Sequence, residues 1–179
     1  MSRCILLLGG ARSGKSAYAQ RLAEGMAERV LFVATAQALD EEMQARIEAH
    51  RRARPRHWRT IEATVGLGRE IAGKVGEAQV VVIDCLTLLV SNLLLENPEP
   101  VAAEERVRRE VEDLVACVRT AAATFIVISN EVGLGLVPDN AVGRLYRDLL
   151  GTANQRMAAE ADEVYLMVAG IPLRVKAGV

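Results

Sequence analysis

Short apolar segments alternate along the chain with longer amphipathic stretches, and this alternation restricts the fold more than any other feature of the sequence. The apolar segments lie at residues 4–8, 30–33, 79–83, 124–129 and 164–168, with a shorter run at 173–175. Their length and composition are typical of strands that are buried on both faces. The stretches between them predict helices at residues 15–28, 40–53, 65–75, 87–95, 102–122 and 141–161. The pattern predicts a three-layer α/β fold, with helices on both faces of a mostly parallel sheet.

Length and composition favour a single domain. A chain of 179 residues has the usual length of one domain, and a hydrophobic content of 51% is enough to build a core. Two turn-rich segments, at residues 96–100 and 132–140, interrupt the regular pattern, but neither is long enough to separate domains. We therefore expect residues 1–179 to form one domain.

Charge and cysteine content exclude several classes of protein. The 22 Lys and Arg residues are balanced by 23 Asp and Glu residues, and only 3% of the residues are aromatic, which argues against a nucleic-acid partner. Cys4, Cys85 and Cys117 are odd in number and far apart, so they predict neither a disulfide framework nor a zinc site. No apolar run is long enough for a signal peptide or a membrane span. We expect a soluble cytoplasmic protein.

The strongest functional motif lies between the first predicted strand and the first predicted helix. It matches the pattern GxxxxGKS and consists of Gly9, Gly10, Ala11, Arg12, Ser13, Gly14, Lys15 and Ser16. The glycines let backbone N–H groups converge on phosphate oxygens, and the start of the helix adds partial positive charge. Lys15 is predicted to reach the β- and γ-phosphates, and the Ser16 hydroxyl to bind Mg²⁺.

The alternative interpretation of this motif is a glycine turn that matches the pattern by chance. The chain has only three lysines, and one of them stands at the motif position where a compact ammonium is needed rather than a planar guanidinium. Phosphate binding is therefore the better interpretation, and it makes the predicted fold that of a P-loop NTPase with a RecA-like sheet.

A second candidate magnesium ligand follows the third apolar segment. Asp84 comes directly after residues 80–83, so its carboxylate is predicted at the carboxyl end of a buried strand. In a doubly wound sheet this edge lies beside the loop that follows the first strand, where an acid can hold Mg²⁺ or its waters. Aspartate is also favoured at the N-cap of a helix, so a capping role is the alternative. Ser16 and Asp84 together are the candidate magnesium ligands.

The second predicted helix leads into the most unusual stretch of the chain. Leu39, Met43 and Ile47 recur at four-residue spacing and predict a buried stripe, and Pro55 is predicted to end the helix. Residues 46–59 contain six arginines and the only two histidines of the chain. Arg46, His50 and Arg54 are predicted to share a face because they are also four residues apart.

Several guanidinium groups around an imidazole suit a second site for a phosphate-rich ligand. They would also keep the imidazole neutral by like-charge repulsion, and a neutral imidazole can act as a general base or attack phosphorus. The alternative is a solvated basic helix face with an incidental histidine. For His57, which lies beyond Pro55 and next to Trp58, a structural role is the favoured interpretation.

Short motifs that occur together along nearly the whole chain make the sequence recognisable. They comprise residues 9–16, Ala34-Thr35-Ala36, Arg46-Ile47-x-x-His50-Arg51, Arg54-Pro55-x-x-Trp58-Arg59-Thr60-x-Glu62, Asp84-Cys85-Leu86-Thr87, residues 130–138, Asn154-Gln155 and Ala161-Asp162-Glu163-Val164. The first motif alone fits many enzymes, whereas the combination is specific. In these motifs the sequence resembles the bifunctional adenosylcobinamide kinase/adenosylcobinamide-phosphate guanylyltransferase family of cobalamin biosynthesis.

The resemblance implies two reactions on one corrin substrate. ATP or GTP first phosphorylates the terminal hydroxyl on the aminopropanol arm of adenosylcobinamide. GTP then transfers GMP to an enzyme histidine with release of pyrophosphate, and the GMP passes to adenosylcobinamide phosphate. The histidine of the family motif falls on His50 and not on His57. The resemblance also implies a homotrimer.

The resemblance further implies which residues contact the nucleotide. They are Gly9, Gly10, Ala11, Arg12, Ser13, Gly14, Lys15, Ser16, Ala34, Thr35, Ala36, Arg51, Arg52, Ala53, Arg54, Glu62 and Asp84. Lys15 and His50 are the candidate catalytic residues. Glu131 is a further candidate for orienting a substrate hydroxyl or a metal-bound water, with a helix-capping role as its alternative.

Two other functions fit parts of the same sequence. In a simple nucleoside or nucleotide monophosphate kinase, the arginines of residues 46–59 would bind the phosphate of the acceptor rather than surround a nucleophile. In a non-enzymatic, nucleotide-gated P-loop module, the arginine-rich helix would dock a protein partner. Covalent labelling of a histidine by GTP would distinguish both from the guanylyltransferase.

Overall fold

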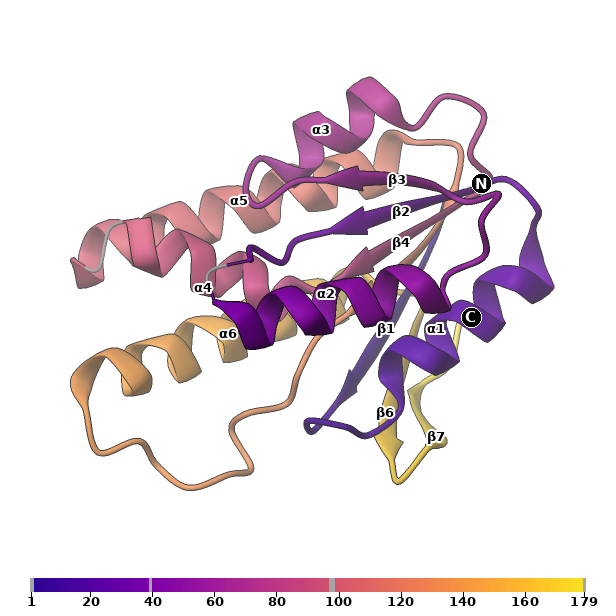
Figure 1. Ribbon diagram of the computed structural model, residues 1–179. Helices are drawn as coiled ribbons and strands as arrows, with labels where there is room; N and C mark the ends of the chain where they lie inside the picture. The colour runs from indigo at the N-terminus through magenta and orange to yellow at the C-terminus, as the bar shows by residue number, and fades with distance from the viewer. Residues whose placement is uncertain (1, 39, 97–98, 179) are drawn as a thin grey trace.

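The described residues contain seven strands, which form one sheet. The computed structural model describes residues 2–38, 40–96 and 99–178, without the side chain of Arg46 (Figure 1). The strands are β1 (Arg3–Gly9), β2 (Val30–Ala34), β3 (Arg59–Glu62), β4 (Val80–Asp84), β5 (Thr124–Ile128), β6 (Glu163–Val168) and β7 (Ile171–Lys176). Their order across the sheet is β3-β2-β4-β5-β1-β6-β7, and β7 alone among them pairs in the antiparallel direction. The predicted mostly parallel sheet is therefore confirmed.

The helices lie close to their predicted positions. They are α1 (Lys15–Met26), α2 (Glu41–Ala53), α3 (Leu67–Lys74), α4 (Leu86–Glu96), α5 (Pro100–Thr120) and α6 (Ala141–Glu160). In the turn-rich segment at 96–100, residues 97 and 98 lie outside the described residues, and α5 begins at Pro100, because proline is well tolerated in the first turn of a helix.

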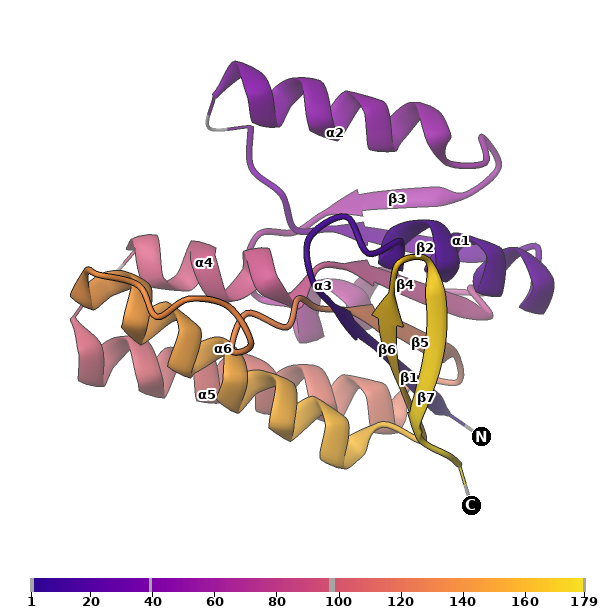
Figure 2. The same ribbon diagram turned by 90° about the horizontal axis from the view of Figure 1, so that it is seen from below.

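The apolar core has two parts, one on each face of the sheet. On one face, α1 packs Ala19 and Ala23 against alternate side chains of β1, β2, β4 and β5. On the other face, side chains of α3, α4, α5 and α6 bury the remaining strand residues around Leu6, Val81 and Phe125. Figure 2 shows these four helices together on one side of the sheet and α1 on the other. Helices on both faces were predicted, and this prediction is confirmed.

Strand β3 was missed by the sequence analysis. Its residues Arg59, Thr60 and Glu62 are exposed, and only Ile61 is half-buried, since β3 forms the outer edge of the sheet beside β2. An edge strand of this kind lacks the continuous apolar run that marks a buried parallel strand. The run at 173–175 is part of the longer antiparallel edge strand β7.

Helix α2 does not pack into the core, so the prediction of a buried stripe is wrong. Met43 and Ile47 are half-buried, and Leu39, the third member of that stripe, lies outside the described residues. In Figure 2 the helix stands apart from the sheet and the other helices. Its last residue is Ala53, in agreement with the predicted stop at Pro55. The apolar side of α2 instead lines a cavity that is described below.

Buried polar contacts hold the ends of β2 and β4 together. The Thr35 hydroxyl donates to the carbonyl of Cys85 at 2.8 Å and accepts from the N–H of Cys85 at 2.7 Å. The Asn92 amide donates to the carbonyls of Thr35 and Thr64 at 2.9 and 3.0 Å. These bonds join three chain segments at the carboxyl edge of the sheet, and they fix the backbone on either side of Asp84.

We expect Thr35→Val to destabilise the protein by about 1–3 kcal/mol, because the buried N–H of Cys85 would lose its partner and the carbonyl of Cys85 would keep only the bond from the N–H of Leu89 at 3.3 Å. Urea unfolding followed by circular dichroism measures this change. The matched control is Thr120→Val, whose hydroxyl is exposed at the end of α5, and we expect it to change stability by less than about 0.5 kcal/mol. Equal losses in the two variants would contradict the role of the Thr35 hydroxyl.

Candidate functional site

The loop between β1 and α1 has the backbone shape that its sequence predicts. Gly9 and Gly14 have φ angles of 150° and 92°, which residues with a side chain rarely adopt. A Cβ on Gly9 would lie 2.7 Å from the carbonyl oxygen of Met167, and one on Gly14 would lie 3.1 Å from Cα of Gly170. The N–H of Gly170 donates to the carbonyl of Ser13 at 2.9 Å. The loop therefore rests on the turn between β6 and β7, and two of its glycines are needed for that close approach.

Lys15 lies inside this loop. Its ammonium donates to the carbonyl oxygens of Gly9 and Gly10 at 2.9 and 2.6 Å, and it lies 3.4 Å from the Ser13 hydroxyl. The residue is only 8% exposed, and this burial lowers the pKa of its side chain. A charged, buried ammonium at the start of a helix is well placed to bind a phosphate anion.

Asp84, at the carboxyl end of β4, connects the loop to the histidine of α2. Its carboxylate accepts a hydrogen bond from the Ser16 hydroxyl, and one of its oxygens lies 3.8 Å from Nδ1 of His50. Its side chain is 15% exposed, and burial raises the pKa of the carboxyl group despite the opposing effects of Ser16 and the nearby cations. Strand β5 separates β4 from β1 in the sheet, yet Asp84 still reaches the first residues of α1.

The arginines of residues 46–59 are arranged differently from the prediction. The side chain of Arg46 lies outside the described part of the chain, so the shared face of Arg46, His50 and Arg54 is described only in part. Arg54 follows the end of α2 and places its guanidinium 3.9 Å from the ring centre of Phe32. The imidazole of His50 is paired with the Asp84 carboxylate, so the ring is not surrounded by guanidinium groups alone.

Two of the other arginines are held by carboxylates on the surface. Arg51 pairs with Glu62 of β3 at 2.8 Å, and Arg52 pairs with Glu48 one helical turn away at 3.0 Å. The Arg54 guanidinium also donates to the Thr60 hydroxyl at 3.3 Å. The contacts of Arg51 and Arg54 join the end of α2 to the edge strand β3 and hold the helix over the carboxyl edge of the sheet, whereas the Arg52–Glu48 pair lies within the helix.

Two neighbouring cavities meet at His50 and Asp84. The first has a volume of about 410 Å³ and is lined by the phosphate loop from Ala11 to Ser16, together with Thr87, Leu88 and Asn130. The second has a volume of about 300 Å³ and lies between α2 and the ends of β2, β3 and β4. Both cavities include Met43 and Leu88 in their walls. The first cavity contains the buried ammonium of Lys15 at the start of a helix, a group that suits phosphate.

Most of the predicted nucleotide contacts line one of these cavities. The second cavity is lined by Ala34, Ala36, Arg51, Arg54 and Glu62. Thr35 is fully buried, and its hydroxyl is hydrogen-bonded to the carbonyl and the N–H of Cys85. Arg52 and Ala53 are exposed, and the carbonyl of Ala53 accepts a hydrogen bond from Gln20 of α1. Gly9 and Gly10 are not among the lining residues either. The nucleotide contacts of all the residues named from the sequence stay predictions.

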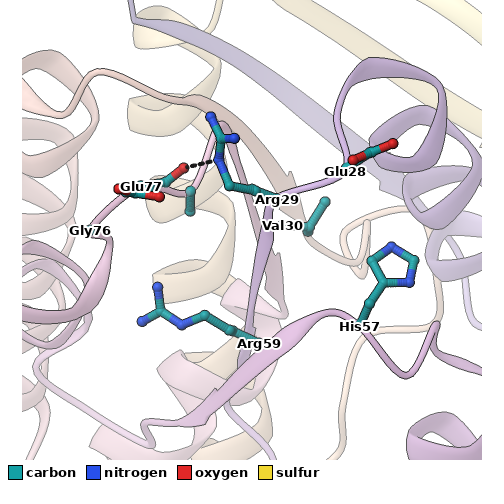
Figure 3. Close-up of a pocket in the computed structure, with 8 residues that line it drawn as sticks. Glu28, Arg29, Val30, His57, Arg59, Gly76 and Glu77 are labelled. Carbon is teal, nitrogen blue, oxygen red and sulfur yellow. Dashed lines mark hydrogen bonds between the residues drawn. The ribbon is translucent and has the colours of Figure 1, made fainter.

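The other two candidates lie outside the walls of these cavities. His57 lines a separate cavity of about 820 Å³ beside Arg29, Arg59 and the first residues of β2 and β3 (Figure 3). That cavity is at the amino ends of these strands, which is the edge opposite to the phosphate loop. Glu131 accepts a hydrogen bond from the N–H of Gly133 at 2.8 Å, so its carboxylate stabilises the turn that follows β5.

Some lining residues were not singled out by the sequence analysis. Phe32, Gln44 and Leu88 line the second cavity, and Asn130 lines the first. The N–H of Asn130 donates to the Thr87 hydroxyl at 2.8 Å, and its carbonyl accepts from Asn154 at 3.0 Å. Asn130 follows a buried strand just as Asp84 does, and this shared position is the signal that could have found it.

The donor atoms at the junction fit a magnesium ion bound together with a nucleotide. Ser16 and Asp84 offer a hydroxyl and a carboxylate oxygen that already contact each other, and Mg²⁺ prefers oxygen ligands and takes part of its shell from substrate phosphates and water. Within the described residues, no cluster of three or more His, Cys, Asp and Glu side chains could hold a metal ion.

The fold and the site together define a P-loop nucleotide-binding protein of the α/β class. The model of the family described as cobinamide kinase / cobinamide phosphate guanyltransferase matches residues 5–175. The chain belongs to this family.

Curated relatives agree with this assignment over nearly their whole length. The chain is 42% identical to the bifunctional adenosylcobalamin biosynthesis protein CobU of Escherichia coli, over 96% of this chain and 99% of that protein. The CobU protein of Salmonella typhimurium gives the same identity and coverage, and the CobP protein of Pseudomonas aeruginosa is 41% identical over 96% of both chains. The resemblance stated from the motifs is confirmed, and the family decides against the nucleotide kinase and the gated module.

We expect Asp84→Asn to stabilise the folded protein near neutral pH. Burial raises the pKa of this carboxyl group, so the folded state binds its proton more tightly than the unfolded chain does. The contribution to stability is therefore present at low pH and is lost as the pH rises through the raised pKa. At about pH 8 the variant should melt a few degrees higher than the natural protein, since 1 kcal/mol shifts the Tm by about 2–4 °C at this chain length.

Thermal unfolding at several pH values tests this expectation. The difference in Tm should shrink as the pH falls, while the enzymatic activity of the variant is lost at every pH. Asp148→Asn removes an exposed carboxylate with the same change in charge, and it should leave both quantities nearly unchanged. A lower Tm for Asp84→Asn at pH 8 would contradict the burial argument.

Proposed function

We propose that this chain phosphorylates adenosylcobinamide with ATP or GTP and then transfers GMP from GTP to the resulting phosphate, with His50 as the covalent carrier. Membership of the cobinamide kinase / cobinamide phosphate guanyltransferase family supports both reactions. The observation that carries the proposal is that His50, from α2, lines the same cavity as Lys15 and Ser16 of the phosphate loop. A histidine in this position can reach a nucleotide whose phosphates rest on the loop.

In the kinase reaction, the protein mainly positions the reactants and stabilises charge. The terminal hydroxyl of the aminopropanol arm attacks the γ-phosphorus, and little covalent chemistry is required of the protein. Lys15 and the N–H groups of the loop would bind the β- and γ-phosphates. Asp84 lies close enough to this loop to hold a metal ion or its bound waters beside the phosphates.

In the guanylyl transfer, Asp84 would orient the histidine. Nε2 of His50 is the proposed nucleophile, because Nδ1 faces the Asp84 carboxylate at 3.8 Å and Nε2 is the nitrogen on the other side of the ring. After Nε2 binds the α-phosphorus the ring is positively charged, and the nearby carboxylate stabilises that charge.

The second cavity would bind the guanine base and the ribose. Its walls combine apolar surfaces, from Phe32, Met43 and Leu88, with the carboxylate of Glu62. A carboxylate can accept hydrogen bonds from the two N–H groups on the edge of guanine, and adenine offers no such pair. Arg51 pairs with Glu62 and would hold the carboxylate in place.

Magnesium would be held by Ser16 and Asp84 together with the nucleotide, and it would supply charge neutralisation at the phosphates. We further propose a cytoplasmic location, which the three unpaired, buried cysteines favour. Among the described residues, no helix is both long and apolar enough to cross a membrane. The single sheet supports one catalytic domain over residues 1–179.

We expect GTP labelled on its α-phosphate to leave label on the denatured protein. A bond between phosphorus and the histidine nitrogen is lost in acid and survives in base. The His50→Ala variant should retain less than about 1% of the label, and His57→Ala, which alters the other histidine, should retain nearly all of it. Undiminished label in His50→Ala would rule out His50 as the carrier.

We also propose that the chain assembles as a homotrimer. Strand β7 exposes Ile171, Leu173 and Val175, each by more than half of its surface, at the edge of the sheet. Exposed apolar residues in such a row are typical of a surface that is covered by another protein chain. A second copy of this chain is the occupant that the family resemblance favours.

Light scattering on the eluting protein should therefore give a mass of three times 19.4 kDa. Leu173→Arg should lower that mass, since a charge would be buried in the contact. Arg174→Leu changes the opposite face of the same strand and serves as the control. A monomeric mass for the natural chain at micromolar concentration would contradict the proposal.

A further inference from the structure

The phosphate loop has a second ligand to bind in the guanylyl transfer. Resting on the proposed function, we infer that the loop binds the phosphate of the acceptor, adenosylcobinamide phosphate, at the same place from which pyrophosphate has left. The two ligands would then exclude each other from the enzyme that carries GMP. The inference assigns a subsite to the second substrate, and it rests on the positions of His50 and the loop.

The histidine and the loop come from different parts of the chain and border the same cavity. The phosphate loop follows β1 and includes Lys15 and Ser16, the first residues of α1, whereas His50 belongs to α2. The α-phosphorus of a nucleotide with its terminal phosphates on the loop would therefore lie between Lys15 and His50.

The geometry of displacement at phosphorus then determines the positions of the attacking and leaving groups. The attacking and leaving atoms lie roughly in line, on opposite sides of the phosphorus. In the first step, Nε2 of His50 attacks the α-phosphorus, the new P–N bond forms, and the bond to the β-phosphate oxygen breaks. The electron pair of that bond leaves with pyrophosphate, which rests on the loop.

In the second step the imidazole is the leaving group. An oxygen of the acceptor phosphate attacks the same phosphorus, a P–O bond forms, and the P–N bond returns its electron pair to Nε2. The ring is neutral again with its proton on Nδ1, so the step needs no further proton donor or acceptor. Since the attack must come from the side opposite to His50, the acceptor phosphate has to occupy the position of the departed pyrophosphate.

The charges of the site favour the same position. Lys15 is buried in the loop and the start of α1 adds partial positive charge, so the loop can bind any phosphate group in that place. The arginines on the other side offer a poorer subsite. Arg51 and Arg52 are paired with Glu62 and Glu48, and they lie on or beside the helix that carries His50. A phosphate bound there would approach from the side of the leaving imidazole.

A partition experiment on the natural protein tests the shared subsite. The protein is labelled with GTP carrying ³²P on the α-phosphate and is then freed of nucleotide and pyrophosphate. The labelled enzyme is mixed with a fixed, nearly saturating concentration of pyrophosphate and increasing concentrations of adenosylcobinamide phosphate. Labelled GTP and labelled adenosylcobinamide-GDP are quantified after a single turnover.

With a shared subsite, the yield of labelled GTP falls to zero as the acceptor concentration rises. In steady-state assays, pyrophosphate then raises the apparent KM for the acceptor and leaves the maximal rate unchanged. A yield of GTP that levels off above zero at saturating acceptor would show that both ligands bind together, and it would overturn the inference while the proposed function stands. Failure to label the protein at all would instead overturn the proposed function.

Two variants distinguish phosphate binding by the loop from phosphate binding by the arginine-rich segment. In Lys15→Met, the KM values for pyrophosphate and for the acceptor should both rise by about tenfold or more on the labelled fraction of the enzyme, because both phosphates lose the same ammonium. Arg56→Gln removes an exposed cation beyond the end of α2 and should leave both values unchanged. A large increase for only one of the two ligands in Lys15→Met would overturn the shared subsite.

Discussion

The buried carboxylate of Asp84 is the group on which the arrangement of the site depends. It contacts the Ser16 hydroxyl on one side and lies 3.8 Å from His50 on the other, so one side chain relates the phosphate loop to the helix that carries the candidate nucleophile. Burial opposes its ionisation, and the Ser16 hydroxyl and nearby cations offset only part of that cost. The backbone beside it is fixed by the buried bonds between Thr35 and Cys85. The ionised carboxylate of Asp84 therefore lowers the free energy of unfolding, at the position where the proposed mechanism uses its negative charge.

Much of the fold could be predicted because buried parallel strands leave a clear pattern. The runs that became β1, β2, β4, β5 and β6 are apolar on both faces, and the GxxxxGKS motif fixes the connection from β1 to α1. The pattern fails where burial is absent. Strand β3 has one half-buried residue, and its place in the sheet is set by pairing with β2 rather than by an apolar face of its own.

The motifs identified the residues of the candidate site, but they did not predict which of these residues lie next to each other. Lys15, Ser16, Asp84 and His50 were all named from motifs, but spacing along α2 suggested arginines as the neighbours of the imidazole. The partner is a carboxylate from β4, which is 34 positions away in the sequence, and local periodicity carries no information about such a pair. The same periodicity assigned Met43 and Ile47 to the core, because an apolar stripe that lines a cavity cannot be distinguished in sequence from one that packs on a sheet.

The contact between the phosphate loop and the turn after β6 links two surfaces that would otherwise be independent. Gly170 donates to Ser13 and lies against Gly14, and the next residue of the chain begins the exposed apolar strand β7. A partner chain bound to β7 would therefore also restrict the motion of the loop that we propose binds the phosphates. Assembly and nucleotide affinity would then be thermodynamically linked, so that dilution of the protein weakens its hold on nucleotide, and nucleotide in turn favours the assembled form.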